Sequence, residues 1–341
     1  MVNLKKTSGK TPIKITDINY AISRENNNPL LYAKRANFFQ EEKKYAKALA
    51  DINRALELDP NNNEFLFRKA LILRDAGNDE QALEAAEEAE NLGYKGPEVF
   101  ILQSELFIRL KNYSNSLEKV NIALESAPFN EFALFYKGFA QAEKGDTAFA
   151  VINYRRAIKN APAFISPHLQ LASIYNAKKD FNLSQRYIKN AEKLDNNNSF
   201  LWFQKGIRYK ILKQIDSAFV CLSKAVAKDK NLYLAHYQLG LLEFNRKNYA
   251  GAATHMAAAI TQSENLNRIR EILAESLEKS GQYNLAIKEY NKILNKNPGD
   301  IWAGWGVRRS NYAIYKTKRD SLRKAGNQIY TLEEDTTNFN F

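Results

Sequence analysis

The sequence repeats one pattern of small, aromatic and turn-forming residues every 34 positions, without insertion or deletion, from residue 29 to residue 300. A fixed period of this length indicates a stack of like supersecondary units, each packing mainly on its neighbours. The unbroken period therefore predicts one elongated solenoid, although 341 residues alone would suggest two or three globular domains. The eight blocks begin at Pro29, Asn63, Pro97, Glu131, Ile165, Ser199, Tyr233 and Asn267.

Two features recur inside the blocks. Position 8 always holds a small residue, which predicts a close approach between two helices at that point. The small residues are Ala36, Ala70, Ser104, Gly138, Ala172, Gly206, Gly240 and Ala274. Four blocks carry a proline near their end, where its missing N–H stops a helix. These prolines are Pro60, Pro128, Pro162 and Pro298.

The first block resembles the tetratricopeptide repeat (TPR) in the order of its aromatic, small, aliphatic and proline residues. That order is carried by Tyr32, Ala36, Phe39, Tyr45, Ala48, Ile52, Ala55 and Pro60. The resemblance implies an all-α fold, a right-handed superhelix of eight helix-turn-helix repeats. It also implies that the first helices of the repeats line a concave groove that binds a protein or peptide, without catalysis.

The ends of the chain follow the same period. Residues 17–22 read DINYAI and residues 51–56 read DINRAL, so we expect residues 13–28 to form an N-terminal capping half-repeat. Residues 301–326 keep one apolar face and one basic face, which suits a pair of capping helices with a solvated outer side. We expect residues 1–12 and 327–341 to be flexible.

Catalytic and cofactor motifs are missing from the sequence. It contains no phosphate-binding glycine loop, no His-Glu-x-x-His and no nucleophile-elbow pattern. The single Cys221 and the three histidines fall on helical positions that suit packing. We therefore expect no enzyme activity, no cofactor, no metal and no small-molecule substrate.

The composition limits the cellular setting only weakly. No apolar run approaches the roughly eighteen residues that cross a bilayer, so no transmembrane segment is expected. The residues after Met1 are polar and do not resemble a secretory signal. A cytoplasmic protein and a cell-envelope lipoprotein that has lost its signal would both look like this.

The positions that face the groove in the resembling family are rich in aromatic residues here. A contiguous exposed aromatic surface usually marks a binding site for a partner. The alternative is that these rings pack between adjacent first helices. The candidate groove aromatics are Phe67, Phe132, Phe135, Tyr136, Phe139, Phe203, Tyr237 and Phe244.

Position 6 is glutamine in three successive blocks, at Gln170, Gln204 and Gln238. A primary amide offers two donors and an acceptor, so stacked amides could hydrogen-bond the backbone of an extended peptide. Glutamine is also a common helix former on solvated faces, which leaves chance as the alternative.

The net charge of +12 raises the question of an anionic partner. The charge is spread over the blocks and both ends rather than concentrated, which disfavours nucleic acid as the main partner. The strongest basic strip consists of Arg308, Arg309, Lys316, Lys318, Arg319, Arg323 and Lys324. This strip is a candidate for contact with an anionic surface, and it is a weaker candidate binding site than the groove. A further alternative is self-association, in which Trp302 and Trp305 dock on another copy of the chain. The expected oligomeric state is a monomer or a weak homo-oligomer.

Overall fold

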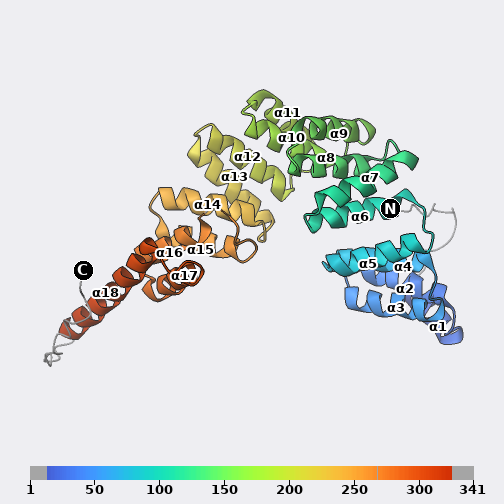
Figure 1. Ribbon diagram of the computed structural model, residues 1–341, viewed down its shortest axis with the longest axis horizontal. Coiled ribbons are helices and arrows are strands. Elements are labelled where there is room, and N and C mark those ends of the chain that lie inside the picture. The colour runs from blue at the N-terminus through green and yellow to red at the C-terminus, as the bar shows by residue number, and fades with distance from the viewer. Residues whose placement is uncertain (1–13, 267, 325–341) are drawn as a thin grey trace. The chain divides into compact units, whose positions relative to one another are not determined.

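A computed structural model describes residues 14–266 and 268–324, with side chains up to residue 321. Eighteen helices and no strand occur in this part of the chain (Figure 1). The predicted all-α repeat fold is confirmed. The helices divide into two compact units, with the boundary between Leu171 and Ala172 inside α10. The expected flexible ends, residues 1–12 and 327–341, lie outside the described residues.

The helices of the first unit, including the one that crosses its boundary, are α1 (Ile15–Arg24), α2 (Pro29–Glu41), α3 (Tyr45–Leu58), α4 (Asn63–Asp75), α5 (Asp79–Asn91), α6 (Pro97–Arg109), α7 (Tyr113–Ser126), α8 (Glu131–Glu143), α9 (Thr147–Asn160) and α10 (Ile165–Ala177). Those of the second unit are α11 (Phe181–Leu194), α12 (Ser199–Ile211), α13 (Ile215–Lys228), α14 (Tyr233–Asn245), α15 (Tyr249–Ile260), α16 (Ile269–Lys279), α17 (Tyr283–Lys296) and α18 (Ile301–Lys324). Each block therefore supplies one pair of helices.

The first helices begin where the sequence blocks begin in seven of the eight repeats. The exception is α16, which begins at Ile269, two residues after the start of its block. Arg268 before it adopts a left-handed conformation with φ of 52°, and Asn267 lies outside the described residues. The eighth repeat thus enters its first helix later than the period predicts.

The turn between the two helices of each repeat contains a left-handed residue at position 15. In the second repeat this residue is Gly77, with φ of 83°, and the N–H of Asn78 donates to the Leu73 carbonyl at 2.9 Å. This bond closes a Schellman-type end of the first helix and satisfies one of its terminal carbonyls. The position is occupied by Gly77, Gly145 and Gly281, and by Lys43, Lys111, Lys179, Lys213 and Lys247 in the other repeats.

Inside a repeat, the residue at position 8 packs against the side chain at position 24, so the sizes of these two residues have to match. A β-carbon placed on Gly138 would lie 2.9 Å from the ring of Tyr154, and one placed on Gly206 would lie 2.6 Å from Leu222. Such distances are too short for a real contact, so these two positions require glycine as their repeats are packed. The small residue at position 8 therefore has the packing role that the sequence predicts.

At the N-terminal end, α1 packs on α2 and buries Ile18. Arg35 on α2 donates two hydrogen bonds of 2.7 Å to the Asp51 carboxylate on α3 and one of 2.9 Å to the Asn19 side chain on α1. One guanidinium therefore ties the lone helix to both helices of the first repeat.

At the C-terminal end, the expectation of a pair of capping helices is wrong. One continuous helix, α18, runs from Ile301 to Lys324 and packs on α16 and α17. The reason is that Tyr315 stands at the point where every repeat turns through a left-handed glycine or lysine. Nothing in that stretch interrupts a helix.

Candidate protein-binding surfaces

The aromatic residues of α8 form a connected cluster with one ring from the loop before α10. The Phe135 ring lies 5.2 Å from Phe164, 5.4 Å from Tyr136 and 6.3 Å from Phe139, and Phe132 lies 5.0 Å from Phe164. Phe132 is 44% exposed, while the other rings are half-buried. We call these five residues the α8 aromatic cluster. Phe164 was not predicted, because it lies in a loop.

The cluster also has a packing role, because Phe135 lies 5.8 Å from the fully buried Tyr154 of α9. Phe129, just before α8, is 72% exposed and was not among the candidates either. Phe129 and Phe132 are thus the most accessible aromatic residues at this end of the repeat.

Beside the α8 aromatic cluster lies a network of charged side chains that come from α4, α5 and α6. Glu105 accepts hydrogen bonds from Arg74 at 3.4 Å and from Arg109 at 2.6 Å, and Arg109 also reaches Asp79 at 3.2 Å. Burial, together with the nearby Glu105 carboxylate, raises the pKa of the Tyr136 hydroxyl well above its ordinary value. The side chain of Arg109 is 41% exposed, so the network presents cationic N–H groups to solvent.

Two candidate aromatics are packing residues rather than surface residues. Phe67 is only 8% exposed and stacks on Tyr94 with ring centroids 4.7 Å apart. Phe203 is 7% exposed and stacks on Phe200 at 5.5 Å. Their exposure was inferred from helix position alone, and that inference does not hold because neighbouring rings cover them.

The glutamine pattern does not form an open row of amides. Gln204 is 2% exposed, and its backbone and side-chain carbonyls accept hydrogen bonds of 3.1 and 3.2 Å from Asn176. Lys210 donates to the Gln238 side-chain carbonyl at 2.5 Å. Gln170 is half-buried. The carbonyls of Gln204 and Gln238 thus bond with the preceding repeat instead of facing a ligand.

The remaining candidates on α14 are partly buried. Tyr237 and Phe244 both pack against the hydrophobic core that α14 shares with α15 to α18, and Phe244 contacts Tyr249 edge-on at 5.7 Å. The Lys279 ammonium lies 5.7 Å from the Phe244 ring. These two residues present less accessible surface than Phe132.

The basic strip on α18 is partly neutralised. Arg309 donates two hydrogen bonds to Glu278, at 2.6 and 3.0 Å, and Arg319 lies 3.6 Å from Asp320. Arg308, Lys316 and Lys318 are exposed. The side chains of Arg323 and Lys324 lie outside the described residues.

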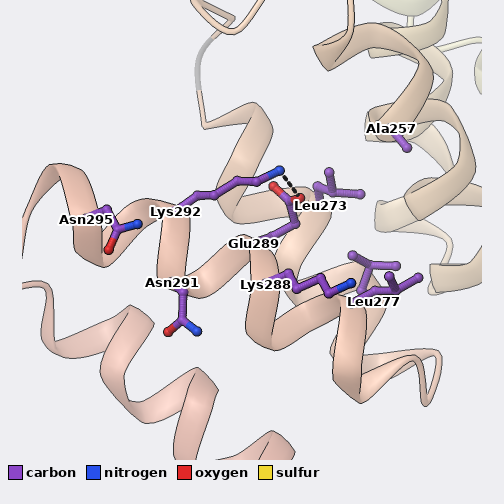
Figure 2. A pocket seen from close by; sticks show the side chains of 9 residues that line it. Ala257, Leu273, Leu277, Lys288, Glu289, Asn291, Lys292 and Asn295 are labelled. Atoms are coloured by element: carbon purple, nitrogen blue, oxygen red, sulfur yellow. Dashed lines mark hydrogen bonds and ion pairs between the residues drawn. The ribbon is translucent and has the colours of Figure 1, made fainter.

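A crevice between α15, α16 and α17 was not predicted. Its volume is about 460 Å³, and Figure 2 shows leucines of α16 and polar side chains of α17 around it. It is lined by Ala257, Leu273, Leu277, Leu285, Lys288, Glu289, Asn291, Lys292 and Asn295. Lys292 pairs with Glu289 at 2.7 Å. A smaller crevice of about 340 Å³ occupies the corresponding place between α3, α4 and α5 and includes Leu49 and Leu73.

Among the described residues, no cluster of three or more His, Cys, Asp or Glu side chains is arranged to bind a metal ion. Two histidines lie side by side, with Nδ1 of His236 and Nδ1 of His255 3.0 Å apart. No helix in the described ranges has the length and apolar character needed to cross a membrane.

Comparison with known proteins identifies the repeats directly. Sequence models of the tetratricopeptide repeat match residues 34–97, 165–198 and 237–301. A TPR repeat-containing protein of Methanocaldococcus jannaschii is 22% identical over 313 residues, which cover 90% of this chain and 50% of the relative. Superkiller protein 3 of Schizosaccharomyces pombe is 26% identical over 202 residues, covering 57% of this chain and 14% of that protein. The chain thus spans half the length of the first relative and less of the second.

Solved structures agree on the fold. The APC/C hetero-tetramer Cut9–Hcn1 matches with a TM-score of 0.61 at 16% identity, over 86% of this chain and 58% of the other. A tetratricopeptide repeat protein from Parabacteroides merdae matches with a TM-score of 0.61 at 15% identity, over 73% of this chain and 99% of the other. The repeat period, the helix pairs and these matches together show that the chain is a tetratricopeptide repeat protein, of a family that typically acts as a non-enzymatic scaffold for protein–protein interaction.

Proposed function

We propose that the α8 aromatic cluster, with the adjoining surface of α6, binds an apolar peptide segment of a partner protein. The observation that carries the proposal is the exposure of Phe132, at 44%, above a connected set of aromatic rings. Large exposed aromatic side chains supply much of the binding energy at protein interfaces, because they bury a large area and lose little conformational entropy.

The neighbouring charges suggest how the peptide is held. Arg109 is already fixed by Glu105 and Asp79, so its remaining N–H groups are positioned in advance. A guanidinium held in this way hydrogen-bonds backbone carbonyls or an acidic side chain with little further loss of entropy. The favoured ligand is therefore an extended segment with apolar side chains and at least one acceptor for Arg109. The buried Gln204 has no part in this proposal.

Family relatives support the general role but not the particular partner. The Cut9–Hcn1 structure shows a protein of this fold in a complex with another protein. At 16% identity that likeness concerns the fold alone, so the ligand has to be identified by selection.

The test is a selection of peptides from a display library against the full chain, followed by calorimetric titration of a selected peptide. We expect Phe132→Ala and Arg109→Ala each to weaken binding by about tenfold or more, which corresponds to about 1.4 kcal/mol. Phe135 is avoided because it packs on Tyr154 and its removal would disturb the core.

Phe149→Ala is the matched control, because Phe149 is 60% exposed on α9, the second helix of the same repeat. It should leave binding unchanged. Equal affinity of the wild-type chain and Phe132→Ala for every selected peptide would refute the proposal.

A further inference from the structure

The outward side of α18 carries an apolar stripe that the repeats do not cover. Ile301, Trp305, Tyr312 and Tyr315 are 75%, 44%, 54% and 51% exposed. With Arg308, whose guanidinium lies 5.8 Å from the Trp305 ring, they are spaced by four, three, four and three residues. Residues at this spacing share one face of a helix. We call these five residues the α18 outer stripe.

The opposite side of α18 already has its partners. Trp302 meets Tyr290 edge-on at 5.2 Å, and Ala303 and Ser310 are fully buried. The inward side thus closes the end of the second unit, and Trp302 is a core residue rather than a docking residue. The outer stripe is additional, and exposed aromatic rows of this kind usually mark an interaction surface.

The chain continues directly from α18 into a segment of matching chemistry. Residues 325–341 contain Glu333, Glu334 and Asp335 and no lysine or arginine. Apolar residues stand on both sides of this acidic group, with Tyr330 and Leu332 before it and Phe339 and Phe341 after it. The α18 outer stripe has the complementary order, in which Arg308 stands between two pairs of apolar residues.

The length of the segment allows it to reach the whole stripe. Fourteen extended residues from 328 to 341 span about 46 Å. The helix from Lys324 back to Ile301 is about 35 Å long. Gly326 stands two residues after Lys324 in the sequence, and glycine is the residue type that most readily reverses a chain after a helix.

A second copy of the chain fits the same stripe less well. Two antiparallel stripes centred on Arg308 would bring the two Arg308 side chains together, and two parallel stripes would also bring Lys316 and Lys318 close to their own copies. Like charges in an interface are costly. A tethered acidic segment has opposite charge and a high effective concentration. We propose that the α18 outer stripe is the docking surface for residues 328–341 of the same chain. This proposal is independent of the one for α8.

The experiment uses full-length chains and a labelled peptide of residues 325–341. In the reversed-tail chain, Glu333→Lys, Glu334→Lys and Asp335→Lys remove the acidic group and should free the stripe. We expect the peptide to bind this chain saturably, as measured by fluorescence anisotropy. It should bind the wild-type chain about tenfold more weakly, because the attached segment competes.

A stripe variant of the reversed-tail chain, with Trp305→Ala and Tyr312→Ala, should also bind about tenfold more weakly. Phe149→Ala in the reversed-tail chain is the control and should bind normally. A separate measurement is amide exchange in residues 308–321, which should be slower in the wild-type chain than in the reversed-tail chain.

Two results would overturn the proposal. One is an absence of saturable binding to the reversed-tail chain, or equal binding to its stripe variant. The other is a wild-type dimer in light scattering that Trp305→Ala dissociates, which would make a second copy the occupant.

Discussion

At position 15 of each repeat, either a glycine or a lysine adopts the same left-handed backbone conformation. Gly145 adopts φ of 93° there, whereas Lys213 adopts 60°. A left-handed conformation is easy for glycine, but the β-carbon of other L-residues makes it costly, by roughly 1–2 kcal/mol. Several repeats therefore keep a lysine at a position that glycine would suit better.

We predict that Lys213→Gly raises the stability of the chain by roughly 1 kcal/mol, because it removes this strain. Gly145→Ala should lower stability by a similar amount, although a β-carbon there meets no atom within 4 Å. Urea unfolding followed by circular dichroism measures both changes. A lower midpoint for Lys213→Gly would show that its side chain contributes more than the strain costs.

The histidine pair predicts sensitivity to acid. Burial, and then the neighbouring His236, lower the pKa of His255, while Glu243 opposes the shift. Because the folded-state pKa lies below the ordinary value of about 6.5, the unfolded chain binds the proton more readily. Stability should therefore fall as the pH drops below about 6.5, and it should be nearly constant above that value.

The measurement is the unfolding midpoint at about pH 7.5 and pH 5.5 for the wild-type chain and His255→Gln. The variant should lose less stability on acidification. Some loss should remain, because burial also lowers the pKa of His168. Equal losses in both chains would exclude His255 as a source of the effect.

At the scale of the helices, the sequence predicts the first residue of a helix better than it predicts which side chains are exposed. Helix starts follow from local signals that recur every 34 residues, such as Asn62, whose side chain accepts the N–H of Phe65 in α4. Exposure depends instead on neighbouring repeats. Gln204 in the sixth block is buried, and Asn176 of the fifth block, 28 residues earlier, donates a hydrogen bond to it. A single block does not contain that information.

The helix α18 supplies a matched pair of glycines for a test of packing. A β-carbon on Gly306 would lie 2.3 Å from the Tyr290 ring, whereas one on Gly304 would meet nothing within 4 Å. We predict that Gly306→Ala destabilises the contact between α17 and α18 by about 1–3 kcal/mol. Gly304→Ala should stabilise the helix by up to about 1 kcal/mol, because alanine favours helix over glycine.

Thermal unfolding and amide exchange in α18 measure both effects. If Gly306→Ala leaves exchange in α18 unchanged, the ring of Tyr290 must be able to move aside. In that case the hydrogen bond of 2.5 Å from the Tyr290 hydroxyl to Glu278 would break when the ring moves.

Across the whole molecule, the repeats should respond to damage locally. Each repeat packs mainly on its sequence neighbours, as α2 does on α1, α3 and α4, so stability is close to a sum of repeat and neighbour terms. The sequence predicts this one-dimensional arrangement from its unbroken period. It does not reveal the division into two units, because the period passes through Leu171 and Ala172 without any change.

We predict that Asp51→Ala destabilises the N-terminal end alone. It removes two hydrogen bonds to Arg35, worth about 2 kcal/mol in total, and so weakens the tie between α1 and the first repeat. Amide exchange should become faster in α1 to α3 and stay unchanged in α14 to α17. Glu57→Ala is the control on the same helix, because Glu57 and its partner Arg54 are both exposed and such pairs contribute little. Faster exchange throughout the chain after Asp51→Ala would show instead that the repeats unfold as one cooperative unit.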